Sequence, residues 1–393
     1  MQARRRHALI VTLAIATFSF AGNLRAAAQT TPPQPAPGCP PLGWAEGLGR
    51  FLTPDAKFPT SDTAEVPTPD CNFHEWSWEA FVWATALIKD PKSGATVPRF
   101  MTLPTPPDLL KKSKTAGARR FRPLTLAARS LHFRGQPGFS EGEGAIVEAD
   151  GNMLVAQNGY PVYASVHMDP LYFKTAQQNL ITTGAYQKGS PSGTFPVGAA
   201  VFKATWQRLA PGQKPPAGTY TTQAQVPVLE TKVTPGEVTI QPVPGKFTTV
   251  TVALIGLHVV GHTANHPEFL WGTFEHKLNS PATPDNTFTP SASTSDPKSF
   301  TLYKANTPYS QVNQAVTPPQ LNLNTKTQTL TPITNVVLEN QTGGENQPGG
   351  VGNIEVLNSQ AQSYLGGLKS PQSGFASYNL IGTVWMLPNS YNL

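Results

Sequence analysis

The stretch FTTVTVALIGLHVVGH, residues 247–262, gives the clearest indication of the fold class. In an extended strand, side chains alternate between the two faces of the sheet. The even-numbered residues from Val250 to His262 therefore share one face, and the odd-numbered residues from Phe247 to Val259 share the other. Both faces are largely apolar, which is typical of a central strand that is buried on both sides. The stretch therefore predicts a sheet with further strands on either side of it.

The sequence around this strand also favours β-structure. Asp150-Gly151 and Asn158-Gly159 separate apolar or alternating runs within residues 145–168, and such dipeptides predict hairpin turns. AAVFKATWQRL, residues 199–209, alternates apolar and polar residues as a half-buried strand does. Further strands are expected over residues 218–230, 246–260 and 376–387.

Two helices are expected within this β-rich pattern. FHEWSWEAFVWATALI, residues 73–88, is apolar on most sides, which predicts a buried helix. Asn72 would cap it, with Glu75 in the capping-box position, and Asp90-Pro91 would end it. Asp169-Pro170 predicts the start of a second helix, which Gly184 would close.

The expected fold class is α+β and β-rich. It would be a mostly antiparallel sheet or sandwich with a few buried helices and long loops rich in Pro, Ser, Thr and Asn. The chain has 40 prolines, which argue against a helical bundle. The composition of residues 281–352 predicts long surface loops with a few edge strands.

The N-terminus predicts export from the cytoplasm. Residues 1–28 have the basic start, short apolar run and small-residue site of a signal peptide. Residues 29–69 would be a Pro-rich leader, and residues 70–393 a single β-rich domain, arranged as one body or as two lobes. We expect a periplasmic or secreted protein that is not integral to a membrane, since no later stretch is apolar enough to span a bilayer.

Charge and cysteine content exclude several functions. The formal net charge of +6 includes four arginines before residue 29, and without them 25 basic and 23 acidic residues remain. This near balance argues against nucleic-acid binding. Cys39 and Cys71 are the only cysteines and are expected to form a disulfide, with two free thiols as the alternative. Without C-x-x-C-H, the chain cannot carry a covalent haem c.

Histidines concentrate in GLHVVGHTANHPEFLWGTFEH, residues 256–276. Two histidines and one carboxylate can hold a transition metal and leave positions open for substrate. His258, Glu275 and His276 could form such a site, with His262 as a further ligand; in this reading Trp271 and Glu275 follow Pro267 at helical spacing. The alternatives are a buried histidine hydrogen-bonded to Glu275 and acid–base catalysis at the same residues.

Other motifs are less specific. Residues 138–142, GFSEG, match G-x-S-x-G, but Pro137 before them and the strand-like residues after them do not fit a nucleophile elbow at Ser140. Residues 111–122 hold six basic residues and no acidic one, which predicts a solvated loop or a docking patch for an acidic partner. Trp271 would pack in the core or line a ligand pocket. The basic residues taken as candidate contacts are Lys111, Lys112, Arg119 and Arg120.

One ordered set of phrases resembles a poorly characterised family of secreted bacterial proteins described as cytochrome-c-like. The phrases are FHEWSWEAFVW, GAIVEADGNMLVAQNGYPVYASVHM, FKATWQRL, ALIGLHVVGHT, PEFLWGTFEH and NLIGTVWM, between about residues 70 and 388. Several family members carry a C-x-x-C-H near the C-terminus, whereas this chain ends in VWMLPNSYNL. The resemblance implies a periplasmic domain associated with redox proteins, and His258, Trp271, Glu275 and His276 match its most recognisable segments.

These observations lead to two expectations of function. The first is a secreted or periplasmic protein that binds a small-molecule ligand or a periplasmic redox protein and has no haem c of its own. The second is a metal-dependent oxidoreductase or hydrolase that uses His258, Glu275 and His276.

Overall fold

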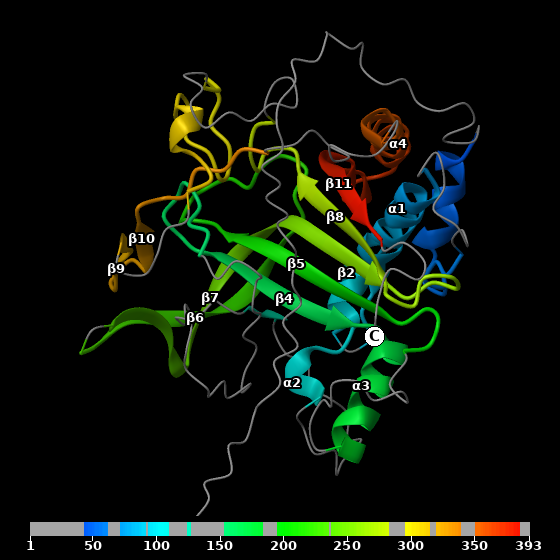
Figure 1. Cartoon of the computed structure of the whole chain (residues 1–393), viewed down its shortest axis with the longest axis horizontal. Coiled ribbons are helices and arrows are strands. Elements are labelled where there is room, and N and C mark those ends of the chain that lie inside the picture. The colour runs from blue at the N-terminus through cyan, green and yellow to red at the C-terminus, as the bar shows by residue number, and fades with distance from the viewer. Residues whose placement is uncertain are drawn as a thin grey trace, which may run out of the picture.

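A computed structural model describes most of the chain from residue 43 onward. It covers residues 43–61, 71–91, 93–109, 124–126, 153–183, 195–235, 237–282, 295–314, 320–338 and 350–385. The described residues form an α+β fold in which a mostly antiparallel sheet of seven strands carries helices against it (Figure 1). This confirms the expected fold class, and the main sheet is single rather than half of a sandwich in the described part of the chain.

The strand predicted from residues 247–262 is central in the sheet. β7 (Glu237–Gly261) pairs on one edge with β8 (Leu270–His276) and on the other with β5 (Ala200–Arg208). Residues 237–253 of β7 form a long hairpin with β6 (Thr221–Thr234), which projects from the sheet in Figure 1. The sheet is completed by β4 (Val162–Met168) beside β5, β11 (Tyr378–Val384) beside β8 and the short β3 (Leu124–Thr125), which pairs with β6 in parallel.

The first α-helix packs against the sheet as its apolar sequence predicts. α1 (Cys71–Thr85) contacts β7, β8 and β11, and most of its side chains are buried. It starts at Cys71, so Asn72 lies within the helix and is not its cap. It also ends before Asp90, because the chain turns there into a hairpin of β1 (Leu87–Lys89) and β2 (Thr96–Pro98). Asp90 belongs to that turn, where its side chain accepts hydrogen bonds from Ser93.

The folded part extends further toward the N-terminus than residue 70. The 3₁₀-helix η1 (Ala45–Leu52) lies within the expected leader, and its apolar residues join the main core. Arg99, at the start of the 3₁₀-helix η2 (Arg99–Thr102), fixes the C-terminal end of η1. Its buried guanidinium donates hydrogen bonds to the carbonyl oxygens of Phe51, Thr53 and Trp83. These hydrogen bonds therefore connect the N-terminal segment to the end of α1.

Two further helices complete the packing. Asp169 caps α3 (Pro170–Thr183) as predicted, because its carboxylate accepts hydrogen bonds from the backbone N–H groups of Leu171 and Tyr172. α4 (Gly350–Gly366), which was not expected, packs against α1 and β11. Its buried side chains recur at helical spacing and include Ile354, Leu357, Ala361 and Leu365.

The remaining described elements are short. They are α2 (Pro106–Leu109), η4 (Tyr309–Gln311), the hairpin of β9 (Asn322–Asn324) and β10 (Thr329–Thr331), and η6 (Gln372–Ser377). Most buried apolar side chains form one core, and a small second cluster surrounds Tyr303. None of the helices in the described segments is both long and apolar enough to cross a bilayer.

Several predicted features fall on residues that the structure does not describe. They are the signal peptide, Cys39, Asp150-Gly151, the GFSEG motif and the basic segment 111–122 with Lys111, Lys112, Arg119 and Arg120. The pairing of Cys39 with Cys71 and the docking patch therefore stay predictions.

Candidate functional site

The histidine-rich stretch is divided between the two faces of the sheet. Residues 270–276 form strand β8 and not a helix, and their burial alternates along the strand. Gly272 faces α1, because a Cβ atom built on it would lie 2.6 Å from Oγ of Ser77. Trp271, Thr273 and Glu275 therefore lie on the opposite face. His258 lies beside Thr273 there, with Nδ1 3.0 Å from its Oγ1.

His276 lies on the α1 side of β8 and is held by the backbone. Its Nε2 donates to the carbonyl oxygen of Ala217 at 3.0 Å, and its Nδ1 accepts from the N–H of Leu278 at 3.2 Å. Burial lowers the pKa of His276 to about 4. The imidazole is therefore neutral near pH 7, and both of its nitrogens are occupied by structural hydrogen bonds.

The residues of the expected metal site are therefore not brought together. Glu275 and His276 are adjacent in a strand, so they point to opposite faces, and the hydrogen bonds of His276 go to the backbone and not to Glu275. Burial raises the pKa of Glu275, and a hydrogen bond with the Asn279 side chain opposes this shift. No group of three or more His, Cys, Asp or Glu residues in the described segments has the geometry to hold a metal ion.

The other residues of the stretch lie beyond the end of β7. The His262 ring packs 5.5 Å from the Phe269 ring, centre to centre. His266 Nδ1 lies 2.7 Å from Oε1 of Glu268, and its ring packs against Phe73 of α1. These contacts assign packing roles to the two rings and a buried ion-pair geometry to His266 and Glu268.

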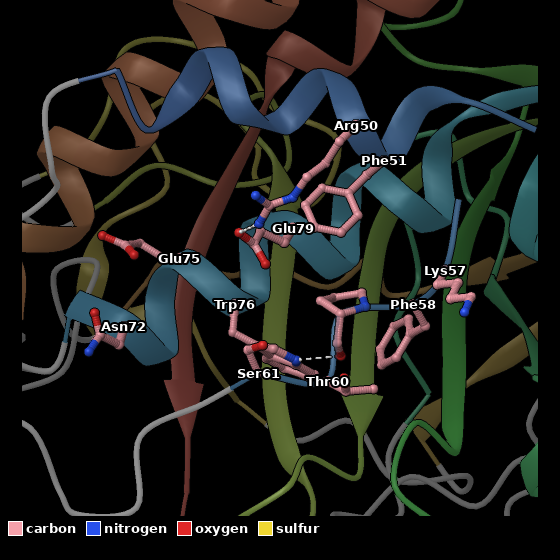
Figure 2. Close-up of a pocket in the computed structure, with 11 residues that line it drawn as sticks. Arg50, Phe51, Lys57, Phe58, Thr60, Ser61, Asn72, Glu75, Trp76 and Glu79 are labelled. Carbon is pink, nitrogen blue, oxygen red and sulfur yellow. Dashed lines mark hydrogen bonds and ion pairs between the residues drawn. The ribbon is translucent and has the colours of Figure 1, made fainter. Parts of the chain in front are cut away.

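A groove along α1 is the more promising site, and Figure 2 shows the residues that line it. Its volume is about 630 Å³. Its walls come from η1, from the loop that follows η1 and from the exposed side of α1. The lining residues are Arg50, Phe51, Lys57, Phe58, Pro59, Thr60, Ser61, Asn72, Glu75, Trp76 and Glu79.

Aromatic side chains fix the loop that forms one wall. The indole N–H groups of Trp76 and Trp83 donate to the carbonyl oxygens of Pro59 and Ala56, at 3.1 and 2.8 Å. The Phe58 ring packs edge-on against both indoles, with centroid distances of 6.0 and 5.3 Å. These bonds and contacts place the loop before the groove is occupied, which reduces the entropy lost on binding.

The last residue of β7 and the segment after it also contact this loop. The N–H of Ala264 donates to the carbonyl oxygen of Thr60 at 3.2 Å. At Gly261, a Cβ atom would lie 2.7 Å from both the Phe58 ring and the Trp76 ring. Glycine is therefore required for the rings to pack this closely against the strand.

Two carboxyl groups one helical turn apart on α1 give the groove its chemistry. The Arg50 guanidinium donates to Glu79 at 2.7 Å, and this pairing opposes the upward shift that burial imposes on the pKa of Glu79. Burial, and secondly the charge of Glu79, raises the pKa of Glu75 to about 7. Oε1 of Glu75 lies 3.3 Å from Sγ of Cys71. Near neutral pH, Glu75 can therefore accept or release a proton when a ligand changes its surroundings.

A second groove of about 560 Å³ lies along α4 and is lined mainly by polar side chains. Two of its amides already make structural hydrogen bonds. Asn358 accepts from the Trp78 indole, and Gln362 donates to the carbonyl oxygen of Tyr378. These amides are committed to the fold, so the α1 groove is the better candidate.

Sequence reasoning did not identify Glu75 and Glu79 as site residues. Their spacing of four on an otherwise apolar helix is a usable signal, because two carboxyl groups at that spacing share one face. This spacing was not used because Glu75 was interpreted as part of a helix cap. Arg50 and Lys57 could not be placed from sequence, because their segment was assigned to the leader.

Comparison with known proteins adds no further identification: no family model matches the chain, and no curated protein or solved structure shows significant similarity to it.

Proposed function

We propose that the chain is a secreted or periplasmic binding protein whose small-molecule ligand occupies the α1 groove. The observation that carries this proposal is the groove itself, with aromatic rings on its inner wall and polar side chains at its opening. Ligand sites in proteins are concave, largely preformed and lined by apolar groups with a few placed polar ones. The volume of about 630 Å³ also lies within their usual range.

The electrostatics of the groove support the same function. Titratable groups with shifted pKa values concentrate at functional sites, and Glu75 has such a value in a concave position. Arg50 and Glu79 hold each other in place beside it. Within the described segments, the arrangement offers a ligand a carboxyl group that has no cationic partner, next to an ion pair.

A redox-protein partner would use a different part of the chain. Its motivation is the basic segment 111–122, which lies outside the described residues, together with the resemblance to the cytochrome-c-like family. The groove therefore supports a small-molecule ligand and not a redox-protein partner. Neither proposal gives the protein a haem c of its own.

Blocking the groove tests the proposal. A panel of amines, amino acids, sugars and carboxylates is screened for an increase in the melting temperature of the full mature chain. We expect at least one class to raise it, and Ser61→Trp to abolish that shift. Ser359→Trp, which places the same ring in the α4 groove, should leave the increase in melting temperature unchanged. The proposal fails if no compound raises the melting temperature or if Ser61→Trp has no effect on the compounds that do.

Elemental analysis of protein purified without an affinity tag tests the metal-dependent alternative. One equivalent of zinc, copper or iron, lost on His258→Ala, would restore that alternative. The division of His258 and His276 between two faces of the sheet gives it no geometric support.

A further inference from the structure

We infer that the α1 groove binds a ligand with a primary ammonium group, and that this group pairs with the Glu75 carboxylate. The inference rests on the proposed function, because it names the class of ligand for the same groove. It draws on the charges, the burial and the positions of the groove residues.

The charges in the groove leave one carboxyl group without a cation. Four charged side chains line it, namely Arg50 of η1, Lys57 of the following loop, and Glu75 and Glu79 of α1. Arg50 and Glu79 form an ion pair at 2.7 Å. No salt bridge reaches Glu75 from the described segments, and Figure 2 shows Lys57 and Glu75 at opposite ends of the groove.

The surroundings of Glu75 favour a cationic ligand over an anionic one. Glu75 is half-buried, and the negative charge of Glu79 acts on it from one turn along the helix. Both effects disfavour its ionised form. A ligand cation in contact with the carboxylate would offset both, whereas an anion would add to the repulsion. The site therefore discriminates by charge at this end.

The neighbouring side chains suit an ammonium group on an aliphatic chain. Asn72 lies three residues before Glu75, so both side chains share one face of α1, and its amide oxygen can accept a second ammonium hydrogen. Phe58 is half-buried beside Trp76 and offers apolar surface to methylene groups. Thr60 and Ser61 are exposed at the opening of the groove.

Pairing with an ammonium group has a distinct proton signature. A carboxyl group with a pKa of about 7 is about half protonated at pH 7. Binding of a cation would ionise it and release about half a proton for each ligand bound. The ionised fraction rises about tenfold between pH 6 and pH 8, so the affinity should rise by about the same factor. The ligand amine keeps its charge over this range.

Three four-carbon probes separate charge from size: 1,4-diaminobutane, 1,4-butanediol and succinate. Their affinities for the full mature chain are measured by isothermal titration calorimetry at pH 6 and pH 8, and proton release is measured in two buffers of different ionisation enthalpy. We expect the diamine alone to bind, about tenfold more tightly at pH 8. Glu75→Gln should abolish binding, Glu75→Asp should retain part of it, and Glu355→Gln in the α4 groove should change nothing.

The outcomes distinguish the ligand class from the function. If the diol or succinate binds as tightly as the diamine, or if diamine binding survives Glu75→Gln in folded protein, the ammonium inference is wrong. If other compounds bind and Ser61→Trp blocks them while the diamine does not bind, the groove remains a ligand site of another class. If no compound binds in the groove, both proposals fall.

Discussion

Replacing Glu75 by glutamine should stabilise the protein at alkaline pH and leave its stability unchanged at acid pH. Burial and the charge of Glu79 raise the pKa of Glu75 from 4.5 to about 7. Between these values the folded state holds a proton that the unfolded state has lost. The free energy of unfolding therefore falls as the pH rises through this window. Glutamine resembles the protonated carboxyl group and does not ionise, so the variant avoids this loss.

The magnitude follows from the size of the shift. A rise in pKa from 4.5 to about 7 corresponds to about 3 kcal/mol for a fully buried group. Glu75 is only partly buried, and solvent screens its interactions, so we expect about 1–2 kcal/mol. Relative to the wild-type protein, Glu75→Gln should gain this amount at about pH 8 and nothing at about pH 4.5.

Urea unfolding followed by tryptophan fluorescence measures both free energies. The control is Glu46→Gln, which removes an exposed carboxylate from η1 and should change the stability little at either pH. A gain of the same size at both pH values would show that ionisation of Glu75 is not involved. A loss of stability at about pH 8 would mean that the carboxylate has a stabilising partner, and the ligand argument would then lose its basis.

Three other experiments test the fold and the expected disulfide. The His276 ring has a pKa of about 4 in the folded state, so the free energy of unfolding should fall by about 2–3 kcal/mol between about pH 6.5 and pH 4. His276→Phe should remove this loss, and urea unfolding at both pH values measures it. Gly261→Ala should cost about 1–3 kcal/mol by displacing Phe58 and should weaken ligand binding, both seen in melting curves with and without ligand. Mass spectrometry after thiol alkylation should find Cys39 and Cys71 joined, and reduction should lower the free energy of unfolding by about 3 kcal/mol.

The elements that were predictable from sequence are those whose local pattern and tertiary environment agree. β7 is apolar on both faces and has a strand on each edge, and Asp169 caps α3 with its own carboxylate. β8 was misread because residues 271 and 275 share a face in a helix and also in a strand. Only the pairing with β7 and β11 selects the strand, and pairing is not visible in a single segment.

The candidate site was less predictable because it depends on contacts between distant segments. Arg50 belongs to a segment whose composition indicated a linker, yet η1 is held to α1 by the buried guanidinium of Arg99 and by core packing. The histidines were predicted to form a metal or acid–base site because imidazole can bind metals and transfer protons. The alternation of β8 divides them between two environments, and burial keeps His276 neutral and bonded to the backbone.

The same physical effect, burial, gives these two residues different roles. At His276 it suppresses the charged form, and two backbone partners satisfy the neutral ring, so the residue is committed to the fold. At Glu75 it also suppresses the charged form, but the carboxyl group opens onto a groove and has only a sulfur atom of Cys71 in hydrogen-bond range within the described segments. A group whose charge is disfavoured, and whose missing partner can enter from solution, is a group that a ligand can satisfy.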